Sequence, residues 1–128
     1  MTDHELDLIY RVSQHPLWAW REGMLGVKVF PQTTFMNDLE YKRYVKDENF
    51  SDFGPSIVDP YTVYLIWEEL KKFNLPGYSI VRSYDRGNYK SGFKKGNNKS
   101  ILLYSSHSEG RIALRMWLWC AARSLEQN

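Results

Sequence analysis

Apolar residues near the start of the chain recur at the spacing of a helix. The residues that share one face, at intervals of three and four, are Leu8, Ile9 and Val12. Thr2 or Asp3 can accept hydrogen bonds from the free N–H groups of the first turn, and Pro16 disfavours helical geometry in the residue before it. The pattern predicts an N-terminal helix that ends before Pro16.

The clearest helical pattern lies in the middle of the chain. Asp59 suits the cap position, and Pro60 suits the first helical position because its missing N–H is not needed there. Pro76 and Gly77 supply the stop signal. The pattern predicts a helix over 60–73, whose apolar face holds Val63, Ile66, Trp67, Leu70 and Phe73.

Three segments rich in β-branched and aromatic residues follow this helix. Side chains alternate between the two faces of a strand, so Arg82 shares a face with Ile80 and Tyr84. Together the segments predict a three-stranded antiparallel meander over residues 78–106. Its strands are expected at 78–84, 89–94 and 100–106, with turns at 85–88 and 94–99.

The last helix is predicted over residues 108–126, with Ser106 or Ser108 as its cap. Its apolar residues cover most of its circumference, which is typical of a helix that is buried on two sides or paired with another chain. We therefore expect a homo-oligomer that forms through this helix. The alternative is that residues 31–56 fold back and cover it.

The stretch between the first two helices has no clear period. Within it, residues 25–30 predict a short strand, and Asn37 or Asp38 can cap a short helix that runs through Tyr44 or Lys46. We interpret most of residues 31–58 as an irregular excursion.

Strands grouped between helices are typical of the α+β class. We predict a single α+β domain over residues 1–128. In it the three-stranded antiparallel meander packs on the two long helices, with the N-terminal helix beside them.

Composition predicts a folded chain without a membrane-spanning segment. Hydrophobic residues make up 43% and aromatic residues 16% of the 128 residues, which is too much for a disordered chain. No apolar run approaches the length that spans a bilayer, and the polar, acidic N-terminus lacks the order of a signal peptide. Cys120 is the only cysteine, so no internal disulfide can form. We expect a cytoplasmic protein.

Charge is divided unevenly along the chain. Residues 1–64 carry six Lys/Arg against ten Asp/Glu, and residues 65–128 carry eleven against five. The C-terminal half is therefore suited to an anionic partner or to packing against an acidic surface. A mixed, solvated surface is the alternative.

Catalytic and metal-binding patterns are not found. The three histidines, His4, His15 and His107, do not stand at metal-ligand spacing with one another or with Cys120. Cys120 has the apolar neighbours of a buried thiol, not of an activated thiolate. We expect no metal, no cofactor and no enzymatic activity.

Binding residues are predicted on the meander and before it. Arg82 and Arg86, with Tyr84 and Tyr89, combine cations and rings that suit a phosphate and a stacked base. Trp18 and Trp20 are a second candidate, as a lid or an anchor for a partner, although they can equally close the end of the core. The secondary basic patch consists of Lys90, Lys94, Lys95 and Lys99, which can contact phosphates or merely keep edge strands and turns soluble.

The order of these elements resembles the small phage and prophage proteins with an ABA-sandwich domain. The resemblance covers residues 1–30 and 57–125, and 31–56 departs from it. It implies a phage or mobile-element origin and brings no catalytic residue. The positions that carry it are Asp59, Trp67, Leu70, Ser108, Ala113 and Arg115.

Two classes of function follow. The first is a non-enzymatic inhibitor that counteracts a host defence in the host cytoplasm, by binding a host protein or by sequestering a small anionic nucleotide signal. The second is a nucleic-acid-binding module that uses the basic 82–99 region. The modest net charge of +2 favours the first class, because nucleic-acid-binding domains are typically more basic.

Overall fold

The computed structural model describes residues 2–30, 39–73, 75, 77–97 and 100–127. In these residues the chain forms three helices and two three-stranded antiparallel sheets, which confirms the α+β class. The elements in chain order are α1 (Asp3–Ser13), β1 (Leu25–Lys28), β2 (Tyr41–Arg43), β3 (Phe53–Pro55), α2 (Pro60–Leu70), β4 (Tyr78–Asp85), β5 (Asn88–Lys95), β6 (Ser100–Ser106) and α3 (Glu109–Gln127).

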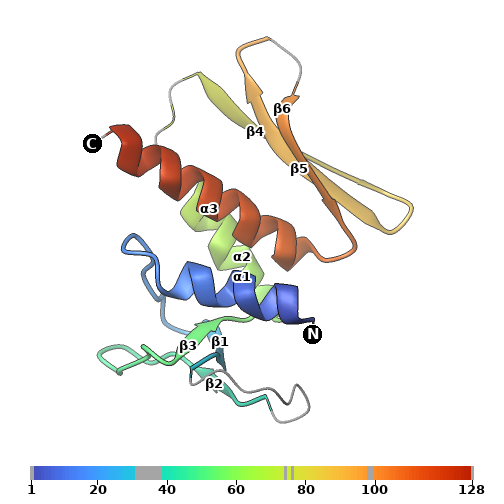
Figure 1. The fold of residues 1–128 in the computed structure, drawn as a ribbon. Helices are drawn as coiled ribbons and strands as arrows, with labels where there is room; N and C mark the ends of the chain where they lie inside the picture. The colour runs from blue at the N-terminus through green and yellow to red at the C-terminus, as the bar shows by residue number, and fades with distance from the viewer. Residues whose placement is uncertain (1, 31–38, 74, 76, 98–99, 128) are drawn as a thin grey trace.

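The elements are stacked as layers around α3 (Figure 1). The sheet of β4, β5 and β6 lies on one side of α3, and α1 and α2 lie on its other side. The sheet of β1, β2 and β3 lies beyond α1. Trp119 of α3 stacks on Phe93 of β5 at a ring distance of 4.3 Å, so the β4–β6 sheet packs mainly on α3.

Most of the apolar surface in the central part of α3 is covered by other parts of the same chain. The helix contacts α1, α2, β5 and β6, and its residues Ala113, Leu114 and Met116 are fully buried. Two helices and a sheet of the same chain therefore cover the central residues of α3, whereas Leu125 near its end remains 46% exposed. The prediction of a homo-oligomer itself stays untested.

Two short strands of the first sheet lie within the excursion predicted for residues 31–58, of which residues 31–38 are outside the described part. β1 is the central strand of this sheet, with β2 on one side and β3 on the other. The short helix predicted through Tyr44 or Lys46 is wrong where the structure describes it, because residues 41–43 form a strand paired with β1. Stacked rings of Phe50 and Phe53, at 4.5 Å, hold the returning strand β3 in place.

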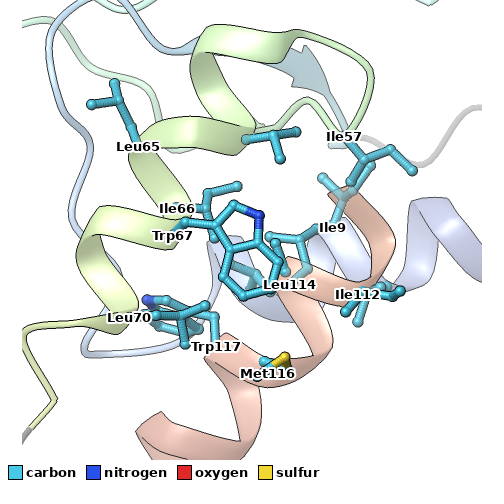
Figure 2. Close-up of a cluster of buried hydrophobic side chains, with 14 of the residues drawn as sticks. Ile9, Ile57, Leu65, Ile66, Trp67, Leu70, Ile112, Leu114, Met116 and Trp117 are labelled. Atoms are coloured by element: carbon cyan, nitrogen blue, oxygen red, sulfur yellow. The ribbon is translucent and has the colours of Figure 1, made fainter. Parts of the chain in front are cut away.

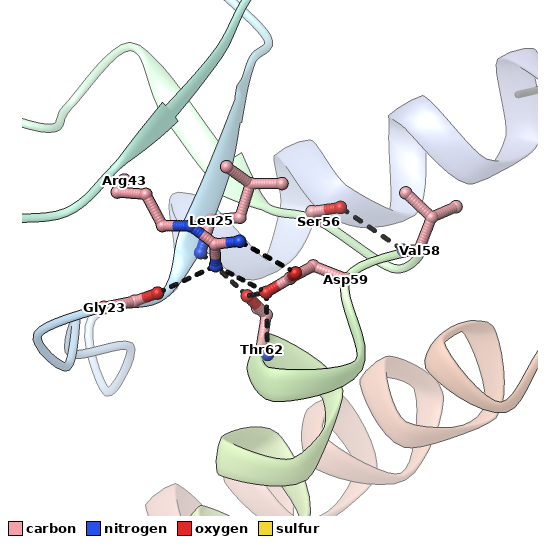
Figure 3. A network of polar contacts seen from close by, with 7 residues as sticks. All are labelled: Gly23, Leu25, Arg43, Ser56, Val58, Asp59 and Thr62. Atoms are coloured by element: carbon pink, nitrogen blue, oxygen red, sulfur yellow. Dashed lines mark hydrogen bonds and ion pairs between the residues drawn. The ribbon is translucent and has the colours of Figure 1, made fainter.

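Asp59 joins this sheet to the start of α2 (Figure 3). Its carboxylate accepts hydrogen bonds from the Thr62 backbone N–H and hydroxyl, at 3.1 and 2.6 Å, and caps the helix as predicted. Arg43 of β2 forks onto the same carboxylate at 2.8 and 3.1 Å. The Thr62 hydroxyl in turn accepts from the backbone N–H of Leu25 in β1. One polar network therefore fixes two strands and a helix together.

The core lies between the helices. Figure 2 shows Ile66, Trp67 and Leu70 of α2 packed near Leu114 and Trp117 of α3. Most of this apolar face of α2 was predicted from its period. Each large apolar side chain buried here contributes roughly 1.5–3 kcal/mol, which is the main stabilising term for the helical layer.

The second sheet is the predicted meander, with strands in the order β4, β5 and β6. Arg86 and Gly87 form the turn between β4 and β5, and both have positive φ, at 51° and 82°. Positive φ at both central residues is typical of the tight turn whose twist matches that of a hairpin. The side chain of His107 reaches back to this turn, with its Nδ1 3.1 Å from the Gly87 carbonyl oxygen.

Candidate functional site

A groove of about 660 Å³ separates α2 from the β4–β5 hairpin and the start of α3. We call it the α2–β4 groove. Its size falls within the usual range for ligand-binding clefts. The side chains that line it include Val58, Tyr64, Trp67, Arg82, Tyr89 and Glu109.

Arg82 is held in the groove by two different contacts. Its guanidinium lies 4.0 Å from the centre of the Trp67 ring, in a cation–π arrangement. Its Nη2 donates to Glu109 Oε1 at 2.6 Å. The Trp67 indole N–H donates to the same oxygen at 3.1 Å. Three residues from α2, β4 and α3 thus form one cluster, and Arg82 is fixed although half its side chain is exposed.

The charges in the groove cancel in pairs. Glu109 neutralises Arg82, and Lys71 pairs with Glu68 at 3.0 Å. Glu109 also stands in the first turn of α3, where the helix dipole favours a carboxylate. An anionic ligand would have to displace a carboxylate that is already well bonded.

Apolar and aromatic side chains remain exposed around this neutral cluster. Val58 is 65% and Tyr64 is 56% exposed, and both line the groove. Tyr84 is 63% exposed, and its ring lies 4.8 Å from that of Tyr89. Tyr, Trp and Arg are the residues most often found at the energetic centres of protein interfaces.

One close backbone contact sets the shape of the groove at its α3 end. Gly110 lies against the carbonyl group of Ile57, and a Cβ atom at position 110 would overlap that carbonyl oxygen. The absence of a side chain therefore lets the N-terminus of α3 approach the segment that precedes α2. This contact positions Glu109 opposite Trp67.

The predicted arginine and tyrosine residues are only partly brought together. Arg82 and Tyr89 line the α2–β4 groove, and Tyr84 contacts Tyr89 at its edge. Arg86 lies instead in the hairpin turn, exposed. Strand pairing explains the split, because Arg82 is opposite Ser91 in the middle of the strands, whereas Arg86 comes after the last pair.

The predicted basic patch is divided between the two faces of the sheet. Lys95 is opposite Tyr78 and lies over its ring at 5.7 Å, on the face toward α3. Lys90 and Lys94 are opposite Ser83 and Ser79, on the other face. Lys99 lies outside the described residues. A nucleic-acid backbone requires a continuous basic stripe. Lys90, Lys94 and Lys95 do not form one, because they lie on two faces of the sheet.

The two predicted tryptophans lie away from the groove, in an aromatic cluster at the end of the helical layer. Trp18 contacts Trp117 and Trp20 with ring distances of 5.4 and 5.5 Å. Trp20 also packs on Phe50 at 4.6 Å, which joins the cluster to the first sheet. Both residues are partly buried, and the Trp18 indole nitrogen is buried without a described hydrogen-bond partner.

The described residues offer no arrangement for metal or thiol chemistry. No group of three or more His, Cys, Asp or Glu that could hold a metal ion occurs among them. Burial raises the pKa of the Cys120 thiol to about 12, so it stays protonated, as its apolar neighbours in the sequence indicated. His107 is exposed, and its ring contacts the Gly87 carbonyl rather than a nucleophile.

Sequence reasoning missed Trp67 and Glu109 as parts of the site. Trp67 was assigned to the core, and it is 6% exposed, yet one face of its ring receives Arg82. Glu109 was interpreted only as part of a helix start. Neither residue has a local signal that points to Arg82, because the three come together only when α2, β4 and α3 pack.

Comparison with known protein families, with curated proteins and with solved structures finds no match. The resemblance to phage ABA-sandwich proteins therefore stays a prediction. Within the part of the chain that the structure describes, no helix has the length and apolar character needed to cross a bilayer.

Proposed function

We propose that this chain is a non-enzymatic binding protein whose α2–β4 groove receives a segment of another protein. The observation that carries the proposal is the contrast within the groove. Its central cation, Arg82, is neutralised by Glu109, whereas Val58 and Tyr64 around it remain exposed. A neutral groove with exposed apolar walls is suited to a polypeptide rather than to a multiply charged nucleotide.

One strand that lines the groove, β4, is also suited to pair with an extended segment. β4 is an edge strand of its sheet, so alternate residues direct backbone N–H and C=O groups away from β5. A strand added to such an edge gains main-chain hydrogen bonds, and its side chains enter neighbouring pockets. Tyr64 and Trp67 supply the facing wall from α2.

The biological role remains the one predicted from the sequence. A protein that binds a partner in its groove without catalysing a reaction acts as an inhibitor or adaptor. Counteraction of a host defence by a phage-encoded protein in the host cytoplasm is the role we propose, and it rests on the resemblance alone.

The test compares the capture of partners by three forms of the protein. The wild type, a groove variant with Val58→Ser and Tyr64→Ser, and a control variant with Tyr41→Ser are used as bait in extract from the host cell. Tyr41 is 42% exposed and belongs to β2, in the other sheet. A photo-crosslinking residue at position 64 then reports direct contact.

The proposal predicts a protein that is captured by the wild type and by the Tyr41 variant but lost with the groove variant, and that crosslinks at position 64. Equal capture by all three forms would contradict it. So would native mass spectrometry in which the protein retains a nucleotide that the groove variant no longer holds.

A further inference from the structure

A second groove, of about 400 Å³, lies between α1, α3 and β6. We call it the arginine groove. It shares no lining residue with the α2–β4 groove. The side chains that define its chemistry are Arg11 and Asp7 from α1, Arg111 and Arg115 from α3, and Tyr104 from β6.

The three arginines of this groove differ from others in the chain. Arg21, Arg43 and Arg82 each have a carboxylate partner within 4 Å. Within the described residues, none of the three arginines of the groove has such a partner. Arg115 has a cation–π contact instead, with its guanidinium 5.8 Å from the centre of the Tyr104 ring.

Helix geometry explains how the cations gather. Arg111 and Arg115 are one helical turn apart and therefore lie on one face of α3. Arg11 comes from the facing helix α1, whose contact with α3 closes the groove. Like charges that converge in a partly apolar groove repel one another, and an anion between them relieves the repulsion.

We propose that the arginine groove binds the phosphoryl groups of a small di- or triphosphate. Guanidinium groups match phosphate oxygens with paired, charge-assisted hydrogen bonds, and three of them suit a ligand with more than one phosphoryl group. The inference is independent of the proposed protein partner, since the two grooves have no residue in common.

The surroundings favour a small molecule over a nucleic-acid strand. The first turns of α1 carry Asp3, Glu5 and Asp7, of which Asp7 lines the groove itself. A long polyanion that continued past the arginines would meet these carboxylates. A compact ligand held among the arginines meets Asp7 alone of these three carboxylates, because Asp3 and Glu5 do not line the groove.

The test uses isothermal titration calorimetry on the full chain at physiological ionic strength. The probes are inorganic pyrophosphate, inorganic tripolyphosphate, ATP and a single-stranded DNA oligonucleotide. We expect pyrophosphate, tripolyphosphate and ATP to bind, with the oligonucleotide weaker than ATP. The double variant Arg111→Gln/Arg115→Gln should weaken ATP binding by about a hundredfold, or about tenfold for each charged hydrogen-bonding partner removed.

Two further variants keep the test decisive. Arg11→Gln, at an exposed position of α1, should fold normally and weaken ATP binding by about tenfold. Arg86→Gln removes an exposed arginine outside the groove and should leave the affinity unchanged. The proposal is overturned if no phosphate probe binds, if Arg11→Gln and Arg86→Gln have the same effect, or if the oligonucleotide binds more tightly than ATP.

Discussion

The Arg82 guanidinium and the Glu109 carboxylate meet at 2.6 Å, although 27 positions separate them in the sequence. The same carboxylate accepts the indole N–H of Trp67. This ion pair makes the centre of the α2–β4 groove neutral, because Arg82 is already bound to a carboxylate and is not available to an anionic ligand. It also ties the β4–β6 sheet to both long helices.

Replacing Glu109 with Gln keeps an acceptor for Trp67 but removes the charge. We expect the free energy of unfolding to fall by about 1 kcal/mol, because the half-exposed ion pair contributes roughly 0–1 kcal/mol and the helix dipole adds a few tenths. Urea denaturation measures the change. Glu68→Gln, which breaks the exposed pair with Lys71, is the control, and an equal or larger loss there would contradict the prediction.

Asp59 makes stability depend on pH in the acidic range. Hydrogen bonding from Arg43 holds the pKa of Asp59 below its ordinary value of 3.8, with Thr62 adding to the effect and burial opposing it. Because the folded state binds this proton less tightly than the unfolded state, the contribution is complete above about pH 4 and is lost as the pH falls through the folded pKa.

Asp59→Asn therefore tests this contribution. The variant keeps a capping side chain but should lower the free energy of unfolding at pH 7, through loss of the charged hydrogen bonds from Arg43. In urea denaturation the difference from wild type should shrink as the pH approaches 2. Arg43→Gln should behave in the same way, and combining the two changes should cost little more than either alone. A difference that persists unchanged in acid would refute the assignment.

The elements that could be predicted from the sequence are those whose signals are local. The caps and the 3.6-residue periods mark α1, α2 and α3, and alternation with turn residues marks the meander. The first sheet has no comparable signal. β2 and β3 are three residues long, and β3 contains Gly54 and Pro55, which are unusual within strands.

What stabilises the first sheet comes from distant parts of the chain. Gly54 packs closely against Ile9 of α1, and the ring of Phe50 packs on Trp20. These contacts exist only after the helices have docked, so no window of sequence contains them. The strands at residues 41–43 and 53–55 therefore have no local signal in the sequence.

The candidate sites follow the same division. Alternation along β4 correctly set Arg82 apart from its neighbours on the opposite face, but it gave no indication of Glu109. The arginine groove was not predicted at all, because Arg11 and Arg111 lie near opposite ends of the chain and are joined only by the packing of α1 on α3.

The backbone of Arg86 in the hairpin turn is strained, and a substitution can relieve the strain. Arg86 has a φ of 51°, which costs a residue with a side chain about 1 kcal/mol, whereas Asn tolerates this geometry and Asn-Gly is favoured in such turns. We expect Arg86→Asn to raise the free energy of unfolding by roughly 0.5–1 kcal/mol. Thermal and urea denaturation measure it. A loss of stability would show that the Arg86 side chain makes a contact worth more than the strain.

Gly110 offers the sharpest test of how the α2–β4 groove is built. A Cβ atom at this position would overlap the carbonyl oxygen of Ile57. This oxygen belongs to the backbone, so it cannot move aside as the end of a flexible side chain could. Gly110→Ala should therefore lower the free energy of unfolding by about 3 kcal/mol, through overpacking. Gly96→Ala is the matched control, since a Cβ there has open space and only its φ of 60° is unfavourable, so it should cost about 1 kcal/mol. If the two variants lose the same stability, the close approach of α3 to the segment before α2 is not what sets the groove.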